Sequence, residues 1–192
     1  GNIATTGSGT LTVAGNTTLS GTNNLGSNPT VTLGSNATFP AGHILQVKNT
    51  LMGDRLNFTP SSQTWTDIAG LSVQITPSSS SNKIMVFATV HGVTLQNVVG
   101  FLRTERDSTA VGIGNASGSK TRISGAIKET TSYDIQCSNW SFIDSPATTS
   151  QLTYKIMVYS NGTVYINRPT TTADNWSVAA AVSSITLMEI AG

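Results

Sequence analysis

Apolar and polar residues alternate along short runs through most of the chain beyond residue 64. The run Leu71–Thr76 alternates strictly, and a longer run from Lys83 to Val93 has apolar residues at every second position. A period of two predicts β-strands with one buried face, here Ile84, Val86, Ala88 and Val90 in the longer run. The same pattern predicts further strands at Val98–Glu105, Lys120–Lys128, Tyr133–Phe142, Leu152–Tyr159, Thr163–Asn167 and Ser183–Ile190.

Turn-forming residues separate these runs and indicate the fold class. A Ser-rich stretch follows Pro77, and Ser160-Asn161-Gly162-Thr163 lies between two alternating runs, which predicts a β-hairpin. About nine strands joined by Gly, Ser, Asn and Thr turns, without a helical period in any long segment, predict an all-β fold. We therefore expect a C-terminal antiparallel β-sandwich of jelly-roll type, with its last strand in a central position.

The beginning of the chain carries an internal repeat, in which Thr10–Leu19 aligns with Thr30–Phe39. Two repeats cannot bury a core alone, because repeat folds need about three or more. Other copies of the chain are expected to supply the missing apolar surface, in a β-rich stalk of three chains. A disordered Ser/Thr/Gly linker is the alternative. The residues expected in the stalk and trimer core are Leu11, Val13, Leu19, Leu25, Val31, Leu33 and Phe39.

Charged residues are scarce and unevenly distributed. They make up 10% of the chain, and the first of them is Lys48. This step in charge predicts three segments, namely a stalk at 1–47, a connector at 48–63 and a sandwich head domain at 64–192. The net charge of +1 disfavours nucleic acid as a partner, and the apolar runs are too short for membrane insertion.

Residue types suited to metal binding or catalysis are also few. Cys137 is the single cysteine and the chain has two histidines, so we expect no metal site and no cofactor. Cys137 itself is interpreted as a small buried residue. The glycines of Gly112–Gly118 miss the spacing of a dinucleotide-binding loop and are interpreted as a turn.

One cluster of charges has several interpretations. Glu105 and Asp107 are separated by one residue, and so are expected to share a strand face, flanked by Arg103 and Arg106. The cluster fits an intersubunit ion-pair network, a sugar-binding patch or a glycosidase carboxylate pair. We favour the network, and we do not expect an enzyme.

Two predicted loops, 107–119 and 169–175, carry polar side chains of the kind that hydrogen-bond sugar hydroxyls. Trp176 follows the second loop and has an aromatic face that can stack on a sugar ring, whereas Trp140 is expected in the core. The candidate receptor or glycan contacts are Asp107, Asn115, Ser117, Thr171, Asp174, Asn175 and Trp176.

Six segments add a resemblance to these patterns: Phe39–Val47, Leu71–Val86, Arg106–Thr109, Ser141–Ser150, Thr163–Arg168 and Ser184–Ile190. In their order and spacing they resemble the C-terminal part of bacteriophage tail-fibre proteins, especially those of phages with marine and cyanobacterial hosts. The resemblance implies a homotrimeric fibre of the virion, assembled in the host cytoplasm and extracellular after release. It also implies three kinds of partner, which are other copies of the chain, upstream fibre or tail proteins, and a host glycan or outer-membrane protein.

The expected function is therefore multivalent attachment to a bacterial surface by the distal part of a viral tail fibre. A purely structural virion fibre, including a shaft or trimerisation module, is the main alternative. A bacterial extracellular adhesin comes next, and an enzyme comes last.

Overall fold

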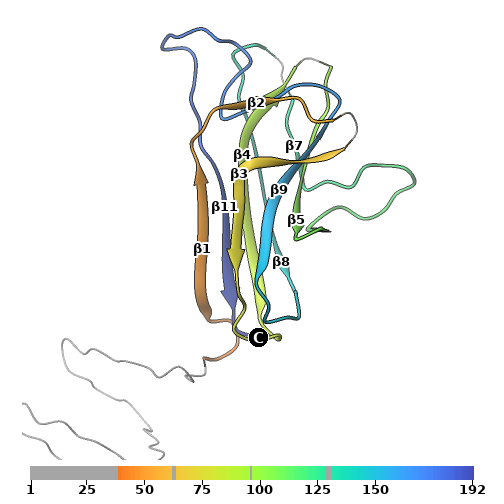
Figure 1. Ribbon diagram of the computed structural model, residues 1–192, viewed down its shortest axis with the longest axis vertical. Helices are drawn as coiled ribbons and strands as arrows, with labels where there is room; N and C mark the ends of the chain where they lie inside the picture. Colours follow the sequence, from red (N-terminus) through yellow and green to blue (C-terminus); the bar gives the residue numbers. More distant parts are fainter. Residues whose placement is uncertain (1–38, 62–63, 96, 129–130) are drawn as a thin grey trace, which may run out of the picture. The chain divides into compact units, whose positions relative to one another are not determined.

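The computed structural model describes residues 39–61, 64–95, 97–128 and 131–192, which Figure 1 shows as ribbons. All of the predicted stalk residues except Phe39 lie outside the described residues. No helix in the described part is long and apolar enough to cross a membrane. The strands of this part are β1 (Ile44–Met52), β2 (Leu56–Phe58), β3 (Trp65–Ile75), β4 (Lys83–Thr94), β5 (Gly100–Arg106), β6 (Thr109–Val111), β7 (Gly125–Ala126), β8 (Gln136–Asp144), β9 (Leu152–Ser160), β10 (Val164–Ile166) and β11 (Ser183–Ile190).

Two antiparallel sheets pack face to face as a β-sandwich. The first has the order β1-β11-β4-β8, with short β10 also pairing β4, and β2 pairing β10. The second has the order β3-β9-β5, and short β6 and β7 both pair the free edge of β5. Successive long strands alternate between the sheets. The all-β sandwich is confirmed, and β11 lies between β1 and β4 as expected of a central last strand.

The core fills the space between the sheets. The alternation predicted for β4 is confirmed, because Ile84, Val86, Ala88 and Val90 are all buried. Buried residues of β5 and β9, among them Leu102, face them from the second sheet. Each such aliphatic side chain contributes about 1.5–3 kcal/mol when it leaves water.

Strand β8 at the edge of the first sheet gives one confirmation and one correction. Trp140 is half-buried and packs against the core cluster, as expected. Cys137 was expected to be buried, but it is exposed. The two residues differ by an odd number of positions, so they point to opposite faces of the sheet.

The hairpin predicted at Ser160–Thr163 is wrong, because β9 belongs to the second sheet and β10 to the first. The turn itself forms, since the Ser160 hydroxyl donates to the Gly162 carbonyl at 2.9 Å and accepts from its N–H at 3.2 Å. Turn chemistry is local, whereas the sheet that a following strand joins depends on long-range packing. Here Val164 and Ile166 are buried in the core, and their strand β10 pairs with β4 of the first sheet.

Two predicted boundaries also change. The strand expected at Lys120–Lys128 is only Gly125–Ala126, where short β7 meets β5. Strand β1 runs across the stalk boundary expected at 47/48, and the compact described unit begins at Phe39. The step in charge does not coincide with the start of the sandwich, because β1 is an edge strand whose exposed positions accept neutral and charged residues alike.

Candidate binding surface

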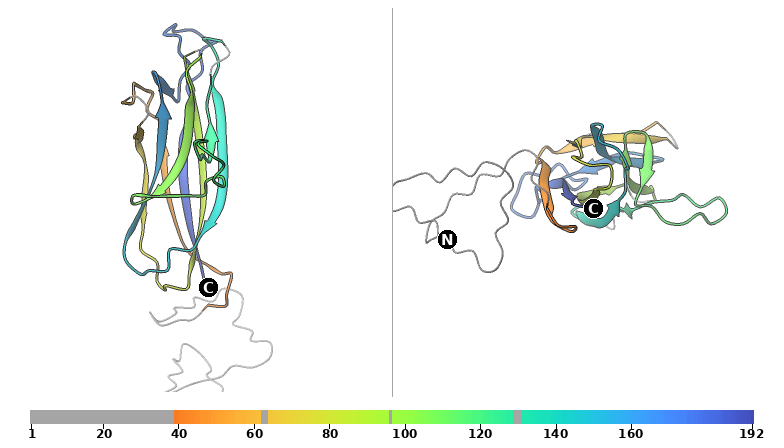
Figure 2. Two further views of the ribbon diagram at one scale, coloured as in Figure 1. Left: turned by 90° about the vertical axis from the view of Figure 1, so that its right-hand side faces the viewer. Right: turned by 90° about the horizontal axis from the view of Figure 1, so that it is seen from below.

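The two ends of the sandwich differ in what they carry. At one end the segment before β1 meets the segment after β11. The Gly42 N–H donates to the Ala191 carbonyl and the Ala191 N–H donates to the His43 carbonyl, both at 2.8 Å. The opposite end carries the connections that follow β1, β4, β7, β9 and β10 (Figures 1 and 2). The longest of them, residues 167–182, is called the tip loop below.

Asn167 anchors the tip loop at its first residue. It is fully buried, with a positive φ of 59°. Its side-chain amide donates to the carbonyls of Met52 at 2.7 Å and Asp54 at 3.0 Å, and its Oδ1 accepts from the Ser183 hydroxyl at 2.6 Å. A buried amide that uses both N–H groups and its oxygen costs little to desolvate. Asn167 therefore ties the end of β1 and the start of β11 to the loop.

Main-chain bonds close the base of the tip loop further. The Asn167 N–H donates to the His91 carbonyl at 2.8 Å, and the Ala181 N–H donates to the Asn167 carbonyl at 3.1 Å. His91 Nδ1 lies 2.7 Å from the carbonyl oxygen of Val182. A carbonyl only accepts, so Nδ1 carries the proton in this contact. The two ends of the loop are thus fastened to each other and to β4.

The far part of the tip loop presents Trp176 to solvent with 98% of its surface exposed. Asn175 shapes the turn beside it, because its Oδ1 accepts from the Ser177 N–H at 3.0 Å and from the Ser177 hydroxyl at 2.6 Å. Asp174 and Asn175 are exposed next to the indole. Aromatic side chains bury about 150–250 Å² when they are covered, so Trp176 offers a large apolar contact beside polar groups.

Thr171 has a different role from its neighbours in the tip loop. Its N–H donates to the Ser132 carbonyl at 3.0 Å, and its carbonyl accepts from Arg168 at 3.2 Å. Its hydroxyl accepts from the Ala173 N–H at 3.3 Å. These bonds hold the tip loop against the connection between β7 and β8. Thr171 therefore fixes the loop's shape.

The remaining predicted contacts lie elsewhere. Asp107 forms the turn between β5 and β6 with a positive φ of 54°, and it exchanges two hydrogen bonds with Thr153, of 2.7 and 3.0 Å. Asn115 and Ser117 lie on the connection between β6 and β7, which extends from the side of the sandwich (Figures 1 and 2). The structure therefore brings together Thr171, Asp174, Asn175 and Trp176, and separates them from Asp107, Asn115 and Ser117.

The predicted charge cluster of Arg103, Glu105, Arg106 and Asp107 does not form a single group in the structure. The prediction that Glu105 and Asp107 share a strand face is wrong, because β5 ends at Arg106 and Asp107 lies in the turn beyond it. Glu105 is buried and pairs with Arg103 on the same strand. Lys155 of β9 lies 4.0 Å from Glu105 and 3.0 Å from Asp67 of β3. These ion pairs join three strands of one chain.

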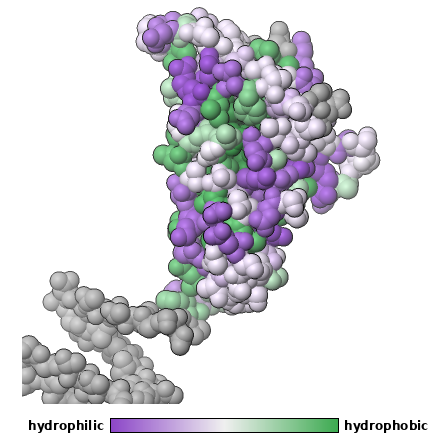
Figure 3. Space-filling model, viewed as in Figure 1, coloured by the Kyte–Doolittle hydropathy of each residue, from purple (hydrophilic) through white to green (hydrophobic). Residues whose placement is uncertain are grey.

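An aromatic group on the outward face of the second sheet is visible only in the structure. Strand pairing places Trp65, Tyr159 and Phe101 side by side, with ring centroids 5.6 and 6.2 Å apart. The Arg103 guanidinium lies 4.0 Å from the Trp65 ring centroid, within the range of a cation–π contact. Figure 3 views the molecule with β3 and β9 in front, where hydrophilic patches alternate with smaller hydrophobic ones. No sequence signal predicts this register.

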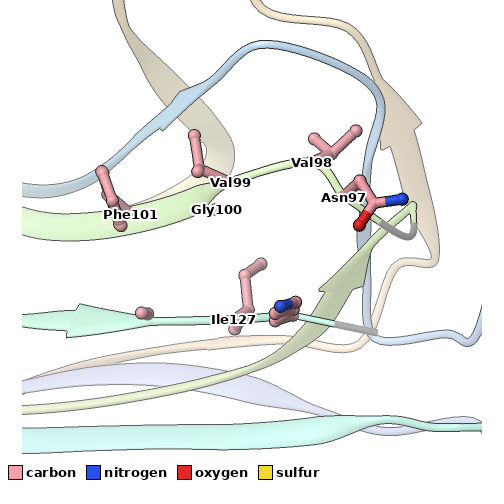
Figure 4. Close-up of a pocket in the computed structure, with 8 residues that line it drawn as sticks. Asn97, Val98, Val99, Gly100, Phe101 and Ile127 are labelled. Atoms are coloured by element: carbon pink, nitrogen blue, oxygen red, sulfur yellow. The ribbon is translucent and has the colours of Figure 1, made fainter. Parts of the chain in front are cut away.

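A pocket of about 360 Å³ adjoins this aromatic group toward the tip end. Residues 97–101 and 126–128 line it, and Phe101 belongs to both features. Figure 4 shows the Ile127 side chain between the two segments. The pocket is mainly apolar. In the described part of the chain, no three carboxylate, imidazole or thiol groups are placed to hold a metal ion.

No protein-family model and no curated protein matches the chain. Solved structures with a similar fold include the Eiger TNF of S. frugiperda, at 7% identity over 78% of this chain and 94% of its own, with a TM-score of 0.43. A chain of infectious bursal disease virus, Gt strain, is 14% identical over 85% of this chain and 46% of its own, with a TM-score of 0.41. A mutant VP2 protein of infectious bursal disease virus is 12% identical over 84% and 42%, with a TM-score of 0.41.

The chain thus spans less than half the length of either viral chain. Identities this low assign no function to the chain.

Proposed function

We propose that this chain is the distal part of a bacteriophage tail fibre, assembled as a homotrimer, and that it attaches the virion to the bacterial host through the tip loop. The observation that supports this most is the polarity of the sandwich. Residue 39 enters at one end, and the longest connection, with a fully exposed Trp176, lies at the other. A fibre needs this arrangement if its shaft comes from one side and its receptor from the other.

The contact itself combines stacking with hydrogen bonding. Trp176 supplies the apolar face for a sugar ring or an apolar side chain, and Asp174 and Asn175 supply the polar groups around it. The bonds of Asn167 hold the loop in place before contact, which lowers the entropy lost on binding. Three such loops on one fibre gain roughly 10²–10⁴ over a single site where all engage together.

The partners that follow are other copies of the chain, upstream fibre or tail proteins, and a host glycan or outer-membrane protein. The protein is then a component of the virion that acts outside the cell. A purely structural fibre module is the second candidate. Exposed apolar side chains on the first sheet, among them Val47 of β1, Phe87 of β4 and Ile143 of β8, favour it, because a neighbouring subunit would cover them.

Binding of the labelled full chain to a panel of marine and cyanobacterial isolates tests attachment. We expect labelling of some strains only, and at least tenfold weaker labelling by Trp176→Ala. The matched control is Ser145→Ala, an exposed position in the connection between β8 and β9 at the other end of the sandwich, which should bind as the unchanged chain does. Equal loss in both variants argues against the tip loop, and labelling of every strain or none favours the structural module.

A further inference from the structure

The outward face of the first sheet carries a continuous apolar row. Ile143 of β8, Met85 of β4, Met188 of β11 and Val47 of β1 are direct cross-strand partners. Partners of this kind project from the same face of a sheet. The neighbouring position Val86 faces the core and is fully buried, so the row faces away from the sandwich.

Large apolar side chains gather on this face. Five of them are between 40% and 67% exposed. Together they expose on the order of 500 Å², toward the upper end of the largest apolar patch of a soluble monomer, about 300–600 Å². The five residues are Ile44, Val47, Leu51, Phe87 and Ile143.

The outward face of the second sheet has a different composition. There Arg103 covers Trp65, and Lys155 pairs with Asp67, so charged side chains lie among the aromatic ones. On β8 and β11 every outward position is neutral. On β4 the charged outward position is Lys83, at the end of the strand. Loss of charge around an apolar centre is the compositional mark of a protein interface.

A second copy of this chain is the occupant that fits this face. The uncharged repeat of residues 1–38 precedes the described unit, and its sequence pattern calls for other copies. The face begins at β1, a few residues after Phe39. Copies joined through the proposed stalk would therefore hold their faces at high local concentration. A neutral face also meets its own copy without like-charge repulsion.

The two edges of the face differ in shape. The β1 edge has protruding side chains, Leu51 and Val47. Near the other edge, between β4 and β8, a groove of about 260 Å³ is lined by Phe87, Asn139 and Ser141 among others. A contact between two different patches is heterologous, and it closes into a three-chain ring when each copy is rotated by a third of a turn from the last. A two-fold dimer instead needs one self-complementary patch.

From these observations we infer that the outward face of sheet β1-β11-β4-β8 is the subunit interface of a three-chain ring, in which the β1 edge of one copy packs into the β4/β8 groove of the next. The inference rests on the homotrimer of the proposed function and does not depend on host attachment.

Sedimentation velocity of the full chain tests the face. The unchanged chain should have three times the mass of one chain, and Val47→Asp and Ile143→Asp should lower the trimer fraction at least tenfold. Ser72→Asp, on the outward face of the second sheet, is the matched control and should stay trimeric. Circular dichroism checks that each variant keeps its strands, because the changed positions lie outside the core.

Crosslinking tests the ring. In a Cys137→Ser background, Leu51→Cys with Ser141→Cys should give a three-chain band under oxidation, and either cysteine alone should not. A band that stops at two chains overturns the ring. A trimer that neither aspartate weakens and that does not crosslink places the interface elsewhere, and leaves the homotrimer standing. A monomeric unchanged chain overturns both, whereas Trp176→Ala tests attachment separately.

Discussion

Trp140 and Thr104 connect the two sheets by a hydrogen bond of 2.9 Å, in which the indole Nε1 of β8 donates to the buried hydroxyl of β5. The bond joins β8, an edge strand of the first sheet, to a position of β5 that pairs with both β9 and β6. It fixes the position of β8 against the second sheet, and so holds in place one side of the apolar face.

Removing either partner of this bond should destabilise the sandwich. Trp140→Phe leaves the Thr104 hydroxyl without its donor, and Thr104→Val leaves the indole N–H without its acceptor. We expect each to lower the free energy of unfolding by about 1–3 kcal/mol. In urea denaturation the double variant should lose less than the sum of the two, and strict additivity would contradict a direct interaction.

Asn167→Ala should loosen the tip loop. The change removes three side-chain hydrogen bonds and puts alanine at a positive φ, so we expect a loss of about 2–4 kcal/mol. Hydrogen exchange should become faster in the tip loop and remain unchanged in β5. Asn167→Gly tolerates the positive φ but makes none of the bonds, so it should fall between the two proteins. Unchanged hydrogen exchange in Asn167→Ala would show that the tip loop keeps its conformation without these side-chain bonds.

Glu189 predicts a loss of stability in acid. It is fully buried, and its carboxylate accepts from Gln46, Asn82 and the N–H and hydroxyl of Ser78, at 2.6–2.8 Å. Burial alone raises the pKa of Glu189, but these hydrogen bonds outweigh it and the pKa lies below the usual 4.5.

A lowered pKa stabilises the fold above pH 4.5, and that stabilisation disappears as the pH falls through the lower folded value. Glu189→Gln replaces one accepting carboxylate oxygen by an NH₂ group, which would face the donors of Gln46, Ser78 and Asn82. The variant should therefore lose about 2–4 kcal/mol of the free energy of unfolding at neutral pH. The difference from the unchanged protein should shrink in acid. Thermal unfolding across pH 3–7 measures it, with exposed Asp174→Asn as the control. A constant difference would contradict the role of the charge.

Tyr154 predicts a loss of stability in alkali. Its buried hydroxyl donates to Asp144 at 2.6 Å, and Arg106 binds the same carboxylate oxygen at 2.5 Å. Burial, followed by the contact with Asp144, raises the pKa of Tyr154 well above 10.0. The folded protein therefore keeps a proton that the unfolded chain releases, so stability should fall as the pH rises above 10.

Tyr154→Phe removes this titration, and its stability should decline less between pH 9 and 11. The exposed Tyr133→Phe variant should behave as the unchanged protein does. Absorbance at alkaline pH should show that Tyr154 does not ionise while the protein is folded. Ionisation of all four tyrosines in the folded state would contradict the burial argument.

The sequence predicts the strands of the sandwich well where one face of a long strand is buried. In β4 the apolar residues Ile84, Val86 and Ala88 occupy every second position, because all three side chains face the core. The choice of partner strand produces no comparable pattern in the sequence. The turn residues around Gly162 suit a hairpin and a crossing between sheets equally well. Strand β1 spans the predicted boundary at 47/48, because the step in charge used to place that boundary is unrelated to strand pairing.

The candidate surface is predictable only in part for a related reason. Composition indicates the loop that carries Trp176, because polar turn residues surround it. The same composition selects Asp107, whose side chain the fold uses to close a turn on Thr153. Neither the buried contacts of Asn167 nor the register of Trp65 with Tyr159 follows from local sequence, since both depend on segments far apart in the chain.

The position of β11 sets an order of events during synthesis. In the described sheets β1 pairs with β11 alone, and among the described strands β1 is synthesised first and β11 last. A nascent chain therefore holds β1 unpaired until β11 has been synthesised. Any product that stops short of β11 keeps β1 open and lacks the middle of a sheet. Chains that end before β11 therefore lack the complete sandwich and expose unpaired strand edges, which favours their aggregation.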